Sequence, residues 1–407
     1  MGTKYKENES QLVLVAGTFD TKGDELTYLA DRLKARNVTV HTVDLSTSGK
    51  ASTADVKPED VASWHPKGAS AVVSDDRGQA VAAMSIAFEN WMEAHKNVAG
   101  IISAGGSGGT ALVTPAMRRL SIGTPKVMIS TVASGNVAPY VGPSDMMMMY
   151  SVTDVEGIHQ ISEKVFGNGA DALAGMLAPK IASTLKGSLP TIGLTMFGVT
   201  TTAVQTITSL LDSKYECLVF HATGIGGQSM EKLADSGMLS GVIDLTTTEV
   251  CDLLMGGVFS ATEDRFGSVI RTKIPFVGSV GALDMVNFGA PDTVPSKYAD
   301  RKFFEHNPQV TLMRTTVDEN KQMGSWIGNK LNAMEGPVRF LLPEAGLSAI
   351  DADGQPFDDP VARKALYEAL ANTVKETDTR KLVHSPQHIN DPEFANLVVQ
   401  SFEEITG

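Results

Sequence analysis

The stretch IISAGGSGGTALVTPAMRRL, from Ile101 to Leu120, decides the fold. It continues a short apolar run that starts at Val98, and such a run is typical of a strand buried on both faces. Four glycines follow, together with Ser107 and Thr110, and the apolar residues after them recur at helical spacing. This order predicts a strand at 98–104, a turn of bare backbone and a helix at 109–120, which is one step of a parallel α/β sheet.

The same alternation of strand and helix extends along the chain. In the first half we expect further strands at 12–17, 38–45 and 125–131, and helices at 24–36, 78–95 and, with interruptions, 157–185. The pattern restarts after the segment KGSLP, with strands expected at 191–198, 215–224, 239–250, 274–286 and 309–315, and helices at 200–213 and 226–237. From residue 347 onward we expect an acidic loop, a helix at 361–376 and a terminal helix.

The sequence therefore predicts an α/β protein with two Rossmann-like parallel-sheet subdomains. Its 407 residues exceed what a single hydrophobic core usually serves. We interpret KGSLP, residues 186–190, as a hinge, so that residues 1–186 form an N-terminal subdomain and residues 187–407 form a C-terminal subdomain with a helical tail. A ligand cleft is expected between them, because open α/β sheets bind ligands at the carboxyl ends of their strands. The similar start of the two halves is compatible with a diverged duplication.

Charge and composition narrow the function classes. The net charge is −13 and no basic patch is evident, which argues against a nucleic-acid partner. The polar start lacks the apolar core of a signal peptide, and no run of 18 apolar residues occurs, so we expect a cytoplasmic protein without a membrane span. Cys217 and Cys251 lie in apolar sequence and are predicted to be buried, reduced thiols.

The glycine-rich turn of the opening stretch is the first candidate site. It consists of Gly105, Gly106, Ser107, Gly108, Gly109 and Thr110. The first N–H groups of a helix have no partner within the helix, and the helix dipole favours an anion there. We therefore expect a cradle for phosphate or carboxylate, while a tight packing turn remains the alternative. The turn matches neither the P-loop nor the G-x-G-x-x-G spacing.

A second candidate anion site is HATGIGGQSME, residues 221–231. Its predicted ligand-binding residues are Gly224, Gly226, Gly227 and Gln228. His221 lies at the carboxyl end of the preceding predicted strand and is a candidate catalytic residue. The alternative for His221 is a hydrogen bond without a chemical role.

Two further turns carry polar residues. In AGTFDTKGDE, we place Asp20 and Lys22 in the loop as ligand or catalytic candidates, while Asp24 is expected to cap the helix that follows. In DLTTTEVCD, the three threonines are candidates for holding a phosphate, a sugar hydroxyl or a metal, or else they start a capped helix; they are Thr246, Thr247 and Thr248.

Elsewhere, polar side chains are expected on loops. These are Asp284, Asn287, His388 and Asn390, and they show no metal-ligand spacing. No G-x-S-x-G, H-E-x-x-H or CxxC motif occurs, so the sequence names no reaction.

Six motifs together resemble a known family. They are AGTFDTKGDE, SAGGSGGT, IGLTMFGVTT, VFHATGIGGQSME, DLTTTEV and ALDMVNFG, and they run in the family's order over nearly the whole chain. On these motifs the chain resembles the ATP-binding N-terminal domain of the tomato mosaic virus resistance protein and its stand-alone bacterial and fungal relatives. The chain departs from the family's pattern at Thr200 to Val204, where the family has a Pro-Cys type sequence, and this argues against a catalytic cysteine there.

The resemblance implies two Rossmann-like subdomains, ATP binding and a homodimer. The apolar segment PSDMMMMYSV also favours a dimer, because it would be a liability on an exposed surface. The net charge of −13 repels ATP at long range, so we expect Mg²⁺ to accompany it. We therefore expect an ATP-using enzyme that acts on a small acidic or sugar-derived metabolite. A nucleotide- or metabolite-binding regulator without turnover and a sugar-phosphate or carboxylate enzyme that does not use ATP remain the alternatives.

Overall fold

The computed structural model describes residues 12–179 and 189–407, which fold into two compact units. One unit lies within residues 1–183 and the other within residues 184–407. Residues 186–188 of the predicted hinge lie outside the described residues. Within the described ranges, no helix is long and apolar enough to cross a membrane.

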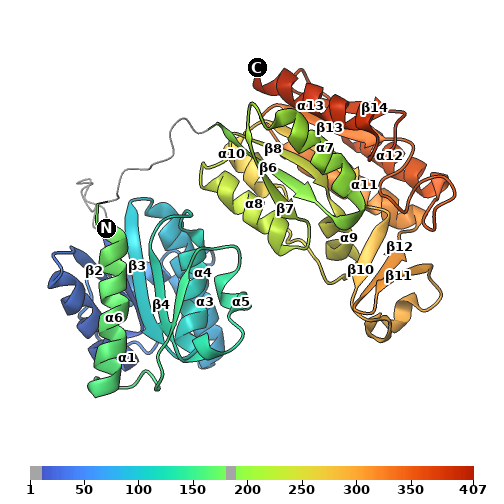
Figure 1. The fold of residues 1–407 in the computed structure, drawn as a ribbon. Coiled ribbons are helices and arrows are strands. Elements are labelled where there is room, and N and C mark those ends of the chain that lie inside the picture. Colours follow the sequence, from blue (N-terminus) through green and yellow to red (C-terminus); the bar gives the residue numbers. More distant parts are fainter. Residues whose placement is uncertain (1–11, 180–188) are drawn as a thin grey trace. The chain divides into compact units, whose positions relative to one another are not determined.

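The N-terminal unit is a five-stranded parallel sheet in the order β2-β1-β3-β4-β5 (Figure 1). Its strands are β1 (Leu12–Gly17), β2 (Val40–Asp44), β3 (Val98–Gly105), β4 (Lys126–Ser130) and β5 (Met147–Tyr150). Its helices are α1 (Phe19–Lys34), α2 (Pro58–Ala62), α3 (Arg77–Ala94), α4 (Ser107–Arg119), α5 (Ala138–Val141) and α6 (Gln160–Leu177).

Side-chain alternation along β1 divides this unit's core between the two faces of the sheet. Val13 and Val15 pack with α1 and α6, whereas Leu14 and Ala16 pack with α3 and α4. Figure 1 shows these helix pairs on opposite faces of the sheet. A strand buried on both faces reads as a continuous apolar run, which is why the sequence LVLVAG predicted β1 correctly.

The C-terminal unit is built on a six-stranded parallel sheet in the order β14-β13-β9-β8-β6-β7. Its strands are β6 (Thr191–Met196), β7 (Glu216–His221), β8 (Gly241–Thr246), β9 (Phe276–Gly281), β13 (Val338–Pro343) and β14 (Arg380–Ser385). A separate antiparallel sheet has the order β10-β12-β11 and consists of β10 (Met285–Phe288), β11 (Phe303–Asn307) and β12 (Val310–Arg314). The helices are α7 (Thr201–Leu211), α8 (Ile225–Asp235), α9 (Thr248–Met255), α10 (Gly267–Thr272), α11 (Val317–Ala333), α12 (Pro360–Thr373) and α13 (Pro392–Thr406).

The two parallel sheets share one strand order. Counted along each unit, both run 2-1-3-4-5, and the C-terminal sheet adds β14 as a sixth strand. The first connection in each unit leads from a central strand to the edge, and the second crosses back to the other side of the first strand. This common order supports the diverged duplication better than the spacing of the first two strands did.

Several predicted elements differ from the structure. Helix α1 begins at Phe19 and its N-cap residue is Thr18, so Asp24 does not cap it, and both Asp20 and Lys22 lie in its first turns rather than in a loop. Helix α4 begins at Ser107, two residues before the predicted start at residue 109.

Strands β5, β11, β13 and β14 were not predicted. The four-methionine segment, taken for core or interface filling, forms part of the edge strand β5, whose side chains are half-buried or exposed. Asn287 lies on β10 rather than on a loop and is fully buried. Cys217 is half-buried on the edge strand β7, in contrast to the buried Cys251.

Candidate functional site

The carboxyl edge of the N-terminal sheet places two predicted sites on adjacent strands. The strand order reverses between β1 and β3, and the helices that follow these strands, α1 and α4, cover opposite faces. Open α/β sheets form a ligand crevice at such a switch point. Asp20 and Lys22 follow β1, and the glycine-rich turn follows β3.

The glycines of this turn have different roles. A side-chain carbon on Gly105 would lie 3.2 Å from Gly109 Cα, so Gly105 serves close packing of the turn. Among the described residues, a carbon on Gly106 would meet only Thr131 Oγ1, at 3.8 Å, and carbons on Gly108 and Gly109 would meet nothing within 4 Å. The N-cap residue of α4 is Gly106, which has no side chain to cap the helix. The first turn of α4 therefore presents N–H groups next to open space.

The two hydroxyl residues of the turn also differ. Thr110 is fully buried, and its hydroxyl donates to Gly106 O at 2.8 Å and lies 2.6 Å from Ser130 Oγ. These contacts engage the hydroxyl in holding the turn to β4. Ser107 is exposed, and its hydroxyl makes no hydrogen bond within the described residues. Ser107 is thus the hydroxyl of this turn that remains available to a ligand.

Asp20 belongs to a small polar network at the ends of β1 and β2. Ser46 Oγ lies 2.9 Å from Asp20 Oδ1 and 2.5 Å from Asp44 Oδ1. A hydroxyl has a single proton, so it donates to one of these carboxylates at a time. Lys22 is half-buried, has a non-helical backbone (φ −130°, ψ 27°) and makes no ion pair within the described part of the chain.

The second glycine loop already holds an anion from the chain itself. Glu249 Oε1 accepts hydrogen bonds from the N–H groups of Gly224, at 2.7 Å, and Gly227, at 3.1 Å. A side-chain carbon on Gly227 would lie 2.1 Å from Glu249 Oε2, and one on Gly226 would lie 1.7 Å from His221 O. Gly224 has φ +82°, where a side chain is strained. These glycines fit the chain around an internal carboxylate.

The other residues predicted around this loop make internal contacts as well. Gln228 Nε2 donates to Gly224 O at 3.2 Å. The exposed His221 ends the edge strand β7, and its ring stacks on Phe197 at 5.2 Å between centroids. Because β7 is an edge strand, this loop lies away from the switch point between β6 and β8.

Glu249 belongs to a buried ionic network around Arg265, whose side chain is 2% exposed. Arg265 donates through Nε to Glu249 Oε2 at 3.0 Å and through Nη2 to Asp244 Oδ1 at 2.9 Å. Its Nη1 donates to Glu231 Oε1 at 2.8 Å. Burial raises the pKa of Glu231 to about 7, although Arg265 opposes this effect. Burial likewise raises the pKa of Glu249.

The threonines of DLTTTEV are all fully buried and bonded within the protein. Thr246 Oγ1 lies 2.8 Å from Thr200 Oγ1, and its N–H donates to Thr195 Oγ1 at 3.0 Å. Thr247 Oγ1 donates to Ser279 O at 3.1 Å, and Thr248 Oγ1 donates to Met285 O at 3.4 Å. These hydroxyls connect β8 and the start of α9 to neighbouring segments. Helix α9 begins at Thr248 with Thr247 as its N-cap residue, but the Thr247 side chain does not cap it, so the threonines start a helix without capping it.

A second buried polar cluster includes residues expected on loops. Asp284 is fully buried and accepts from Ser348 Oγ at 2.8 Å, and burial raises its pKa to about 7, with Asp351 adding to the effect. The ring of His388 lies 2.9 Å from Ser348 O through Nε2. Asn390 Nδ2 donates to Val199 O at 3.0 Å. Within the described residues, no group of three or more His, Cys, Asp or Glu side chains is arranged to hold a metal ion.

Sequence reasoning missed Arg265 and the role of Glu231. Arg265 lies between α9 and α10, in a segment without helical or strand periodicity. No spacing rule connects it to Glu231, Asp244 and Glu249, which come from three other elements. The four groups meet only in the folded chain.

Two family models match the chain. The model described as the N-terminal domain of the uncharacterised protein family UPF0261 matches residues 11–182, and that of the family's C-terminal domain matches residues 189–406.

Similar proteins come from bacteria and a plant. A UPF0261 protein of Rhizobium meliloti is 53% identical over 97% of this chain and 99% of its own length. The ToMV resistance protein Tm-1 of Solanum lycopersicum is 44% identical over 98% of this chain, which spans 56% of the tomato protein. The ToMV susceptible protein of the same plant matches with the same identity and coverage.

Among solved structures, the match to a UDP-GlcNAc 2-epimerase of Methanocaldococcus jannaschii covers 98% of this chain and 93% of the epimerase chain. The sequence identity is 9% and the TM-score is 0.22. A similarity at this level carries no argument about ligand or reaction. The family matches and the sequence identities, over nearly the whole length, lead to one conclusion: the chain belongs to the UPF0261 family.

Proposed function

We propose that the N-terminal unit binds the phosphate groups of ATP at the first turn of α4. The observation that carries this proposal is the open, uncapped N-terminus of α4 at the switch point of the sheet. The N–H groups there point to where an anion can approach, and the helix dipole adds roughly half a positive charge. Glycine without Cβ lets a phosphate oxygen reach the backbone.

The comparison between the two glycine loops supports the choice of α4. In both loops a helix starts after a parallel strand, but the amides of Gly224 and Gly227 at α8 already bind Glu249. An external phosphate at α8 would have to displace a buried carboxylate that is paired with Arg265. At α4, the open space next to Gly108 and Gly109 requires no displacement.

Side chains near β1 would complete this site. Lys22 makes no ion pair within the described residues and can neutralise phosphate charge, and Asp20 is a carboxylate of the type that Mg²⁺ prefers. Mg²⁺ bound with the phosphates would offset part of their charge. The described residues offer no metal site of three or more ligands, so most oxygen ligands would come from the phosphates and water.

The reaction class that we favour is ATP-dependent turnover of a small acidic or sugar-derived metabolite by a cytoplasmic homodimer. A regulator that binds nucleotide without turnover is the second candidate, because the sequence shows no recognisable constellation of a nucleophile and a base. An enzyme that binds a sugar phosphate or carboxylate without ATP is the third.

A ligand panel separates these functions. Thermal shifts with ATP, ADP, NAD and sugar phosphates, each with and without Mg²⁺, identify the class that the protein binds. Calorimetric titration with Mg-ATP then gives the affinity, and a phosphate-release assay with candidate metabolites distinguishes an enzyme from a regulator. If ATP neither stabilises the protein nor binds in the titration, the proposal is wrong.

A further inference from the structure

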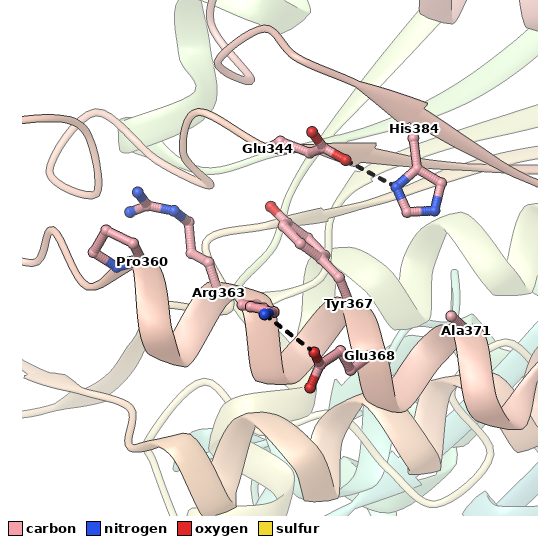
Figure 2. Close-up of a pocket in the computed structure, with 8 residues that line it drawn as sticks. Glu344, Pro360, Arg363, Tyr367, Glu368, Ala371 and His384 are labelled. Atoms are coloured by element: carbon pink, nitrogen blue, oxygen red, sulfur yellow. Dashed lines mark hydrogen bonds and ion pairs between the residues drawn. The ribbon is translucent and has the colours of Figure 1, made fainter.

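A pocket of about 340 Å³ opens in the C-terminal unit, where α12 passes the carboxyl ends of β13 and β14. Glu344 directly follows β13, and His384 lies near the end of β14. Figure 2 shows these two side chains opposite α12, which presents Arg363, Tyr367 and Ala371 toward them. The remaining lining residues also come from α12; they are Pro360, Lys364 and Glu368.

Arg363 is the distinctive residue of this pocket. It is only 7% exposed, and both of its acidic partners bind the same nitrogen. Nη1 donates to Asp351 Oδ1 at 2.8 Å and to Asp358 Oδ1 at 2.9 Å. Nε is enclosed and has no partner, and Nη2 makes no hydrogen bond within the described residues. Nε and Nη2 are thus both unused, and these two nitrogens together can bind a carboxylate in a bidentate arrangement.

The other polar groups of the pocket have partners. His384 Nδ1 lies 2.9 Å from Glu344 Oε1, and Lys364 Nζ lies 3.6 Å from Glu368 Oε1. The Tyr367 hydroxyl donates to the carbonyl oxygen of Pro343 at 2.5 Å. Among the described residues that line this pocket, Arg363 is therefore the one with an enclosed donor that lacks a partner, and such a donor is destabilising unless a ligand or water satisfies it.

We propose that this pocket binds a small organic monocarboxylate, with the carboxylate on Nε and Nη2 of Arg363 and the organic part against Tyr367. The volume lies near the lower end for small-molecule sites. The carboxylates of Asp351 and Asp358, which bind the guanidinium, repel a phosphate dianion more than a singly charged carboxylate. The site lies in the C-terminal unit and does not depend on ATP binding at α4.

The test titrates the full-length protein with acetate, propionate and benzoate, and with acetamide, propionamide and benzamide as neutral matches. Inorganic phosphate is a further probe. We expect at least one acid to bind about tenfold or more tightly than its amide, because a hydrogen bond to a charged group contributes about one decade. If no acid binds, if the amides bind as well, or if phosphate binds more tightly, the proposal is overturned.

Two variants locate the binding. Arg363→Lys keeps a charge for Asp351 and Asp358 but loses the two-pronged geometry, and should weaken binding about tenfold. Arg271→Lys is its matched control, since Arg271 also binds two aspartates but lies on α10, outside the pocket; it should bind the acid as the parent does.

Tyr367→Ala serves if Arg363→Lys fails to fold. It removes the apolar wall one turn from Arg363 without removing a member of the ionic cluster, so acid binding should weaken about tenfold. Unchanged acid binding in a folded Tyr367→Ala protein would place the ligand elsewhere. The same variants should bind Mg-ATP with the parent's affinity. Failure of the ATP proposal can therefore be distinguished from failure of the carboxylate proposal.

Discussion

Glu249 Oε1 accepts a 2.7 Å hydrogen bond from the N–H of Gly224, in the loop whose sequence predicts a phosphate cradle. The loop does bind an anion, but the anion is the side chain of Glu249 on α9, 25 residues after Gly224 in the sequence. Free amides and small residues at a helix start are the features that attract phosphate. In this loop the same features bind a buried carboxylate.

Removal of this carboxylate should destabilise the C-terminal unit. Glu249→Ala leaves two loop amides and Arg265 Nε without their acceptor, and breaking a buried pair of this kind costs about 3–5 kcal/mol. Glu249→Gln should cost less, because an amide oxygen can still accept from the loop. Denaturant unfolding measures both. Acetate should partly restore the stability of Glu249→Ala but not change the parent, since it can occupy the vacated position; equal stability of Glu249→Ala and the parent would contradict the role of this contact.

Gly227→Ala should destabilise the fold whether or not ATP is present. The added carbon would stand 2.1 Å from Glu249 Oε2, which forces a shift in a packed, buried network. Overpacking of this kind costs about 1–3 kcal/mol. Gly109→Ala is the matched control, because its added carbon meets nothing within 4 Å. Thermal melting compares the two, and a Gly227→Ala melting temperature equal to that of Gly109→Ala would show that the loop has room.

Gly108→Val should keep the fold and abolish ATP binding. Its side chain enters the open space next to the first turn of α4, where we place the phosphates. Gly106→Val should act in the same way, whereas Ser107→Ala should cost roughly 1–2 kcal/mol of binding if its hydroxyl bonds a charged oxygen. Calorimetric titration with Mg-ATP measures these effects. Gly175→Val, at an exposed helical glycine of α6, controls for the valine itself. A folded Gly108→Val protein that binds ATP as the parent does would place the phosphates elsewhere.

Stability should fall as pH rises from about 4.5 to 7, in part because of Glu231. Burial raises its pKa from 4.5 to about 7, so in this window the folded protein holds a proton that the unfolded chain has lost. Unfolding then releases a proton, and each such group lowers the free energy of unfolding by about 1.4 kcal/mol per pH unit until the folded group also ionises.

Glu231→Gln tests this assignment. An amide oxygen can still accept from Arg265 and from the N–H of Phe266, which both bind Oε1. Denaturant unfolding at several pH values should show a slope that is shallower than the parent's by up to about 1.4 kcal/mol per pH unit. Identical slopes in the variant and the parent would contradict the raised pKa.

The sequence alone determined the class of fold and most of its order. Runs such as LVLVAG and TIGLTM are apolar without a break because both faces of a parallel strand are buried, and this signal is local. It failed for β14, whose residues RKLVHS include charged and half-buried side chains because the strand lies at the edge of the sheet. It also failed for β5, an edge strand of the other sheet.

Only the tertiary structure decided which glycine loop is open to a ligand. The two loops look alike as sequence, since each places several glycines between a strand and a helix. Their difference lies in Glu249 and Arg265, which approach Gly224 and Gly227 from other elements, whereas no described residue lies within 4 Å of a side-chain carbon placed on Gly108. Local sequence determines how many N–H groups a helix start leaves free, but the packing of distant segments determines whether the chain itself satisfies them.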